Sequence, residues 1–375
     1  MGPSTTVRLE VARAALDRTR WHAVDEVALD DGDARFAVER FALTANNVTY
    51  GAFGDALGYW RFFPVDDPSW GLVPAWGFAT AIESRSDGVP LGSRWWGYWP
   101  MAEHAVLSPA RADAQSFLDG AAHRRDLATV YNRYTRAERR EDDDLAALFR
   151  PLFTTSFLID DFLAESDWFG AEQVVLSSAS SKTAWGLAWC IAERRRRDAP
   201  GRAPRVVGLT SAGNLAFVRS LDVCDDVVAY EALSTLDATQ PAVFVDMRGS
   251  AAFRAEVHAH WRDRLVHSCS VGAAEWGSVG SGRDLPGPKP AVFFAPTQAA
   301  SRIAAWGAAG FESRLGVASE RFLAHVTQRS AAEAGHLRVV EVEGRDGIEA
   351  TWRALVAGTV PPDEGRIAVL AQRGA

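Results

Sequence analysis

The stretch of this sequence best suited to chemistry is a turn of small, hydroxyl-bearing residues. Residues 177–183 read SSASSKT and follow the apolar, strand-like run QVVL at 173–176. A strand that turns sharply into a helix leaves unpaired backbone N–H groups at the helix N-terminus, where the helix dipole is also positive. Small side chains let a diphosphate approach such a backbone, and a lysine adds a cation. The turn therefore predicts a phosphate site at Ser178, Ser180, Ser181, Lys182 and Thr183.

Other interpretations of this turn are weaker, but one stays open. Ser180 or Ser181 could simply cap the following helix, which is compatible with phosphate binding. A P-loop is disfavoured because Leu176 and Ser181 stand where its two glycines belong. A Ser-x-x-K catalytic motif fails because Ala179 occupies the serine position, and no G-x-S-x-G elbow is present.

The end of the next apolar run bears on which nucleotide is bound. Residues 210–214 read TSAGN, with no Asp or Glu to bind a ribose 2′-hydroxyl or to repel a 2′-phosphate. This favours NADP over NAD, although an ordinary loop is the alternative. The candidate cofactor contacts here are Thr210, Ser211 and Asn214.

These motifs need elements that position them, and the order of apolar runs supplies them. Up to about residue 145 the chain has short apolar runs separated by Gly and Pro, typical of a β-rich domain. From about 146 a helical pattern leads into QVVL and then into further strand-like runs with helical segments between them. Such strands, apolar throughout, predict a parallel sheet covered on both faces. The further runs lie at 205–210, 226–230, 242–247, 265–271 and 291–296.

Composition narrows the class of protein. The 375 residues are 47% hydrophobic and 23% charged, which fits two or three globular domains. The net charge of −8 disfavours a nucleic-acid partner. No apolar run is long enough for a membrane span, and no secretory signal is evident. Three widely spaced cysteines argue against a disulfide framework, so we expect a cytoplasmic protein.

The order of these segments resembles the medium-chain dehydrogenase/reductase superfamily, especially its zinc-independent, quinone-oxidoreductase-like branch. The resemblance is carried by WGFATAIESRSDGVPLGSRWWGYWPMAEHAVLSPA (76–110), by the segment 151–188 that contains the serine turn, and by the closing stretch 341–370. More narrowly, FALTANNVTYGAFGDALGYW (41–60) and FFAPTQAASRIAAWG (293–307) resemble the DUF2855 family of this superfamily.

The resemblance implies an α/β architecture with two domains. A GroES-like β-rich catalytic domain would span 1–148 and be completed by about 300–375. A Rossmann domain with a doubly wound parallel sheet would span 149–299. The chain departs from the superfamily at the nucleotide loop, because A-x-x-G-x-x-G corresponds to Ser178, Ser181 and Ala184, and both glycines are lost.

The implied activity is an NADPH-dependent, metal-independent reduction of an α,β-unsaturated carbonyl, a ketone or a quinone. The partner would be a small carbonyl substrate, and relatives of this fold are often homodimers. Tyr230 matches an aromatic residue beside the adenosine. Strand ends on the nicotinamide side would be Asp246, Ser270 and Phe294.

Catalytic zinc of the superfamily's other branch is disfavoured. No cysteine precedes residue 190, and three cysteines cannot form a four-cysteine structural site. The spacing of His258, His260 and His267 does not place all three on one face, so they read as surface or core residues.

A metal-free reduction needs a proton donor near the developing oxyanion. The resemblance places substrate-facing polar groups in a turn at residues 45–51. We therefore predict Tyr50 as the donor, Asn47 as an orienting group and Tyr59 as a second candidate donor. The alternative is that Asn46 and Asn47 stabilise this turn and that Tyr50 packs in the core.

Two rival functions remain open from sequence. The lost glycines slightly favour a non-redox enzyme on the same scaffold, acting by carbon–carbon or acyl chemistry. The other rival is a sensor that binds NADPH without turnover. Oxidation of NADPH by a panel of enones would favour the oxidoreductase over both rivals.

Overall fold

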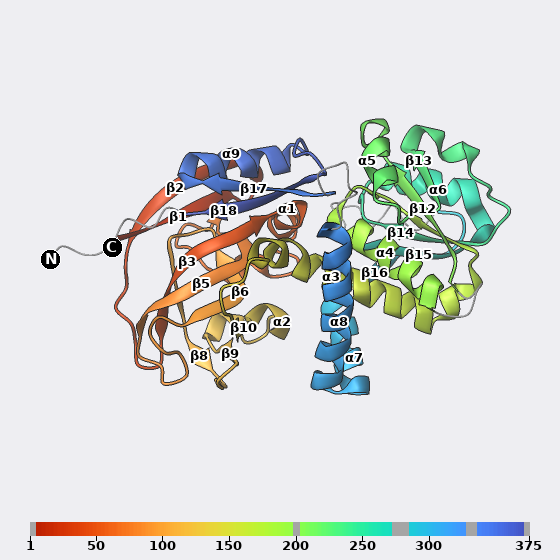
Figure 1. Cartoon of the computed structure of the whole chain (residues 1–375). Coiled ribbons are helices and arrows are strands. Elements are labelled where there is room, and N and C mark those ends of the chain that lie inside the picture. Colours follow the sequence, from red (N-terminus) through yellow and green to blue (C-terminus); the bar gives the residue numbers. More distant parts are fainter. Residues whose placement is uncertain (1–4, 198–202, 272–284, 328–335, 371–375) are drawn as a thin grey trace. The chain divides into compact units, whose positions relative to one another are not determined.

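A computed structural model describes residues 5–197, 203–271, 285–327 and 336–370. The chain divides into two compact units (Figure 1). Unit 1 comprises residues 1–148 and 339–375, and unit 2 comprises residues 149–338. Each unit carries its own sheet system and its own buried core, so each is described separately.

Unit 1 is built mainly from antiparallel strands. One sheet has the order β2-β1-β4, and a larger one has the order β17-β18-β3-β5-β6-β10-β9-β8, with β7 paired to β3. Its strands are β1 (Thr5–Ala12), β2 (Ala15–Asp25), β3 (Ala34–Leu43), β4 (Trp70–Gly71), β5 (Pro74–Ser84), β6 (Arg94–Pro100), β7 (His104–Leu107), β8 (Pro109–Ala110), β9 (Ser116–Asp119), β10 (Arg133–Arg136), β17 (Arg338–Glu343) and β18 (Glu364–Val369). Its helices are α1 (Ala45–Ala52), α2 (Thr129–Asn132) and α9 (Gly344–Val356).

Large aromatic side chains fill the core of unit 1. Trp95, Trp99, Phe117 and Tyr134 are fully buried, and Phe117 stacks on Tyr134 with ring centroids 5.0 Å apart. Gly97 of β6 allows this packing, because a Cβ there would lie 2.2 Å from the Tyr134 ring. Trp95 and Trp99 therefore serve the core, where each buries a large apolar area.

Unit 2 is organised around a parallel sheet of order β13-β12-β11-β14-β15-β16. Its strands are β11 (Gln173–Leu176), β12 (Arg205–Thr210), β13 (Asp226–Ala229), β14 (Ala242–Asp246), β15 (Leu265–Val271) and β16 (Ala291–Phe293). Its helices are α3 (Asp143–Glu165), which begins in unit 1, α4 (Lys182–Arg197), α5 (Leu215–Ser220), α6 (Ala251–Trp261), α7 (Ala295–Trp306) and α8 (Ala308–Thr327). The predicted parallel sheet is thus confirmed, with strands close to the predicted ranges.

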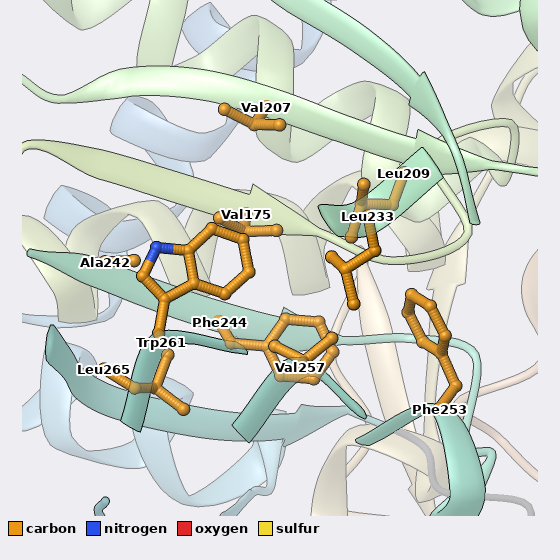
Figure 2. Packing of buried hydrophobic residues seen from close by; sticks show 10 residues of the cluster. All are labelled: Val175, Val207, Leu209, Leu233, Ala242, Phe244, Phe253, Val257, Trp261 and Leu265. Carbon is orange, nitrogen blue, oxygen red and sulfur yellow. The ribbon is translucent and has the colours of Figure 1, made fainter. Parts of the chain in front are cut away.

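The face of this sheet under α6 is packed with apolar side chains (Figure 2). Phe253, Val257 and Trp261 project from α6 onto the central strands, including Phe244 of β14. Successive residues of β11 and β14 are all buried, so both faces of these strands are covered, which explains why their sequences carry no polar alternation. The chain order also makes β11 and β14 neighbours, which places the switch point of the sheet between them.

Helices α3 and α4 approach each other closely at Gly186. A Cβ at Gly186 would lie 2.7 Å from the Ser156 hydroxyl, whose single hydrogen lies between the Thr183 carbonyl at 2.7 Å and the Leu152 carbonyl at 3.0 Å. The acidic run at 141–144 supplies Asp143 and Asp144 to the first turn of α3, where the helix dipole favours carboxylates. The start of α4, and with it the serine turn, is therefore fixed against α3.

Two sequence expectations differ from the structure. Residues 300–338 fall in unit 2, whereas the return to the first domain was expected near residue 300. The helices α7 and α8 pack on one another, and Phe322 of α8 stacks on Phe153 of α3 at 4.6 Å, which explains the difference. The expected polar turn at 45–51 is the helix α1.

Candidate active site

In unit 2, a buried hydrogen-bond network joins the carboxyl ends of β11 and β14. The Ser177 hydroxyl donates to Asp246 Oδ1 at 2.9 Å. Ser177 Oγ in turn accepts the backbone N–H groups of Met247 at 2.8 Å and Arg248 at 3.0 Å. Ser177 is 0% exposed and Asp246 is 1% exposed, so water does not compete for these bonds. The network fixes the two strand ends between which a doubly wound sheet binds its ligand.

Asp246 has a structural role that the sequence did not reveal. Its Oδ1 also accepts the N–H groups of Arg248 at 3.0 Å and Gly249 at 3.1 Å, and its Oδ2 accepts Arg254 Nε at 2.9 Å. Both carboxylate oxygens are therefore used inside the protein. The prediction that Asp246 lines the nicotinamide side finds no support in these contacts.

Ser178 keeps the backbone conformation that glycine normally provides in such a loop. Its φ of 51° lies in the left-handed region, which costs an L-residue about 1–2 kcal/mol. The turn is closed by a 2.7 Å hydrogen bond from Ser181 N to the Ser178 carbonyl. Ser178 N itself donates to the Tyr230 hydroxyl at 3.0 Å. The turn after β11 is therefore sharp, and the Tyr230 hydroxyl lies beside it.

The other serines of the turn connect it to its neighbours. Ser180 Oγ accepts Asn214 Nδ2 at 3.1 Å and lies 3.4 Å from Thr210 Oγ1, so the loops after β11 and β12 meet there. Ser181 Oγ accepts Ala184 N at 3.2 Å, which is the capping role considered as the structural alternative. Ser211 is exposed beside them. The structure therefore brings together the predicted residues of these two loops.

Other predicted cofactor residues occupy varied surroundings. Lys182 and Thr183 form the first turn of α4, whose backbone N–H groups face the turn. Ser270 lies one residue before the end of β15 and is 5% exposed, whereas Phe294 precedes α7 and is 38% exposed. No contact of the described residues joins Ser270 or Phe294 to the serine turn.

Sequence reasoning missed Arg248, which lies at the same end of the sheet. Its guanidinium carbon is 4.1 Å from the centroid of the Tyr230 ring and 4.9 Å from that of Phe253. The available signal was an arginine two residues beyond a buried strand end, in the run DMRG at 246–249.

In unit 1, Tyr50 is the centre of a polar contact within an aromatic cluster. Its hydroxyl oxygen accepts Asn46 Nδ2 at 2.6 Å and Trp76 Nε1 at 3.0 Å. Tyr50 is 4% exposed, while Asn46 and Trp76 are half-buried. Burial raises the pKa of Tyr50, so the hydroxyl stays protonated at neutral pH. Two donors that point at this oxygen would stabilise the phenolate left after it releases its proton.

The contacts of Asn47 give no support to its predicted orienting role. Its Oδ1 accepts Thr44 N at 2.8 Å and its Nδ2 donates to the Pro74 carbonyl at 3.0 Å. These bonds cap α1 and tie it to β5, as a capping box does. The neighbouring Asn46, which the sequence suggested only as a turn-stabilising residue, makes the contact to Tyr50; on a helix it precedes Tyr50 by four residues and shares its face.

Tyr59 belongs to the same cluster. Its ring lies 4.7 Å from that of Tyr50, and its hydroxyl is 3.2 Å from that of Tyr131. Burial raises the pKa of both Tyr59 and Tyr131. Trp76 and Tyr98 complete the cluster at 5.0 Å from one another. The arrangement gathers neutral phenols against apolar surface, which suits proton donation to a neutral carbonyl compound.

The histidines occupy separate surroundings. His258 is bonded to the Ser268 hydroxyl and the Pro286 carbonyl, both at 2.9 Å, whereas His260 is bonded to the Leu236 carbonyl at 3.0 Å. His267 stacks on Phe169 at 4.0 Å. Over the described ranges, no group of three or more His, Cys, Asp or Glu side chains could hold a metal ion.

The family described as a protein of unknown function (DUF2855) matches residues 41–361. The chain belongs to the DUF2855 family. A comparison with curated protein sequences gives no match.

Solved structures reveal the same fold in proteins of low sequence identity. CurK enoyl reductase matches with a TM-score of 0.58 and 12% identity, covering 98% of this chain and 99% of that chain. CurA from Vibrio vulnificus in complex with NADPH matches with a TM-score of 0.58 and 12% identity, covering 98% and 100%. The quinone oxidoreductase from Coxiella burnetii matches with a TM-score of 0.54 and 12% identity, also covering 98% and 100%.

These similarities confirm the expected fold. This DUF2855 protein has the architecture of the medium-chain dehydrogenase/reductase superfamily, with a GroES-like β-rich domain and a Rossmann domain. No helix within the described ranges is both long enough and apolar enough to cross a membrane. The predicted homodimer and cytoplasmic location stay predictions.

Proposed function

We propose that this DUF2855 protein is an NADPH-dependent, metal-independent oxidoreductase that reduces an α,β-unsaturated carbonyl compound, a ketone or a quinone. In this proposal unit 2 holds the coenzyme and unit 1 provides the proton donor. The proposal is supported by the fold, which is shared with proteins titled enoyl reductase and quinone oxidoreductase.

The serine turn at the switch point of the parallel sheet is the main support for coenzyme binding by unit 2. The left-handed Ser178 preserves the sharp bend, and α4 begins directly after it with Lys182. A diphosphate would bind the first turn of α4 beside Lys182, and the ribose would lie toward the loop that contains Asn214. When bound, the nicotinamide would supply a hydride.

The second half is proton delivery from Tyr50. Hydride addition to the substrate leaves negative charge on the carbonyl oxygen, and the Tyr50 O–H would donate its proton to the resulting anion. Asn46 Nδ2 and Trp76 Nε1, already bonded to the Tyr50 oxygen, would then hold the phenolate until solvent returns a proton. The rings of Tyr59 and Tyr98 pack on Tyr50 at centroid distances of 4.7 and 5.2 Å, which leaves little room for water around its hydroxyl.

A coenzyme titration tests the proposal directly. The wild-type chain is expected to bind NADPH more tightly than NADH and to oxidise NADPH with a panel of enones and quinones. Lys182→Ala should weaken NADPH binding about tenfold or more, because a charge-assisted contact is lost. The sequence offers a matched control, since Lys289 is its only other lysine. Lys289→Ala should bind as the wild type does, and no binding of either coenzyme by the wild type would refute the redox proposal.

One observation keeps binding without turnover, or non-redox chemistry, as a second candidate. The Ser178 N–H, which faces the expected diphosphate, is already bonded to the Tyr230 hydroxyl at 3.0 Å. A loop that satisfies its own donor gains less from a bound phosphate. NADPH binding without oxidation across the enone and quinone panel would favour this second candidate.

A further inference from the structure

Arg248 lies at the carboxyl edge of the parallel sheet with its charge unpaired by the known contacts. It is exposed, and no ion pair or hydrogen bond of its side chain is found among the described residues. Its backbone is nevertheless fixed, because Arg248 N donates to both Ser177 Oγ and Asp246 Oδ1 at 3.0 Å. An arginine whose backbone is held in place and whose guanidinium has no hydrogen bond or ion pair among the described residues suits an anionic ligand.

The strand order shows where the guanidinium lies. Arg248 follows β14 and Tyr230 follows β13, and these strands are separated in the sheet by β11 and β12. Their side chains still meet at 4.1 Å. Tyr230 also reaches the turn after β11, since its hydroxyl accepts Ser178 N. The pair therefore lies across the ends of the two intervening strands, next to the serine turn.

The Tyr230 ring is held on two sides. Its hydroxyl is bonded to the turn, and its ring packs edge-on against Phe253 at a centroid distance of 4.7 Å. A guanidinium stacked on such a ring is oriented by its face, so the N–H groups around its edge stay directed outward. Those groups can bind a phosphate in a bidentate way.

The loop after β12 indicates which phosphate group of the coenzyme Arg248 would bind. In a dinucleotide-binding sheet this loop lies beside the ribose 2′ position of the adenosine. Residues 210–214 of this chain contain neither an acid nor a base. The loop is joined to the serine turn by the hydrogen bond between Asn214 and Ser180. A 2′-phosphate bound beside this loop would therefore have to pair with a cationic side chain that follows another strand.

Building on the proposed function, we propose that Arg248 binds the 2′-phosphate of NADPH and makes the protein prefer NADPH over NADH. Tyr230 acts as a positioning residue that holds the guanidinium across the strand ends. The assignment places the specificity residue after the fourth strand of the sheet rather than after the second.

The test is a binding titration of the full chain with NADPH, NADH, adenosine 2′,5′-bisphosphate and 5′-AMP. Arg248→Gln should weaken binding of NADPH and of the bisphosphate by about 10- to 100-fold, the effect of losing a charge-assisted pair. It should change binding of NADH and 5′-AMP by less than about threefold. Arg205→Gln makes the same charge change at the opposite end of β12, where Arg205 pairs with Asp226 at 2.6 Å, and should change neither.

The possible failures can be told apart. If the wild type binds neither coenzyme, the proposed function fails, and this inference fails with it. If the wild type binds NADPH but Arg248→Gln keeps the same preference, only the assignment of Arg248 is overturned. An equal loss for NADPH and NADH overturns the assignment too, because Arg248 would then contact the shared diphosphate. Arg248→Lys, which keeps the charge but not the planar fork, should fall between the wild type and Arg248→Gln, and circular dichroism checks that each variant is folded.

Discussion

Replacing Ser177 by alanine should destabilise unit 2 by about 3 kcal/mol. The hydroxyl donates to the Asp246 carboxylate at 2.9 Å, and a hydrogen bond to a charged group is worth about 1.5–3 kcal/mol. The change also leaves the Met247 N–H without its 2.8 Å acceptor, at a cost of about 1–3 kcal/mol if no water enters. The Arg248 N–H keeps Asp246 Oδ1 as its partner, so it adds little. Because these contributions overlap, the total lies below their combined upper limits.

Urea unfolding followed by circular dichroism measures this loss. With a slope of about 2 kcal/mol per molar urea, the midpoint of the unit 2 transition should fall by about 1.5 M. Ser220→Ala is the control, because Ser220 is exposed and its hydroxyl bonds only the nearby Phe217 carbonyl at 2.7 Å. The control should shift the free energy of unfolding by less than about 0.5 kcal/mol. A Ser177→Ala loss as small as that of the control would show that the two strand ends are not held together by this network.

Three further predictions concern other parts of the molecule. Tyr50→Phe should slow carbonyl reduction at least about 100-fold while leaving NADPH affinity unchanged. The control Tyr134→Phe, which removes another buried hydroxyl of unit 1, should keep a rate within about threefold of the wild type. Equal steady-state rates for Tyr50→Phe and the wild type would contradict the proton-donor role. Ser178→Gly should raise the free energy of unfolding by about 0.5–1 kcal/mol, since it relieves a φ of 51°, and a lower melting temperature would contradict this. Burial lowers the pKa of His258, so the unfolded chain binds more protons below about pH 6.5 and stability should fall as the pH drops from 7 to 5; His258→Gln should flatten that slope in thermal melts, and an unchanged slope would count against it.

The order of apolar runs predicted the Rossmann half of the fold well. The runs QVVL, RVVGLT and AVFVDM became β11, β12 and β14 within one residue of their predicted ends. Strands buried on both faces must be apolar throughout, so each one is visible as a continuous run in the sequence. The boundary near residue 300 was wrong because the sequence of α7 and α8 shows an apolar face without showing which unit it packs on.

The candidate site was only partly predictable. The serine turn was found because strand, small residues and helix are adjacent in sequence. The roles of Asp246 and Asn47 were not, because each is decided by partners that are distant in the chain or belong to the backbone. Asp246 is hydrogen-bonded to Ser177, which is 69 residues away in the sequence, and Asn47 is hydrogen-bonded to the Pro74 carbonyl, which is 27 residues away. Arg248 was missed for the same reason, since its contact with Tyr230 joins two non-adjacent strands.

The sequence alone therefore determined the β-rich and parallel-sheet halves of this chain and the place of its serine turn, because hydrophobic periodicity and local turn chemistry depend on consecutive residues. Only the tertiary structure decided which polar side chains stay available for a ligand. That availability depends on hydrogen bonds between residues that are distant in the chain. Asp246 and Asn47 form their hydrogen bonds within the protein. The Tyr50 hydroxyl still has a proton to donate, and the Arg248 guanidinium still has a charge that a ligand could pair with.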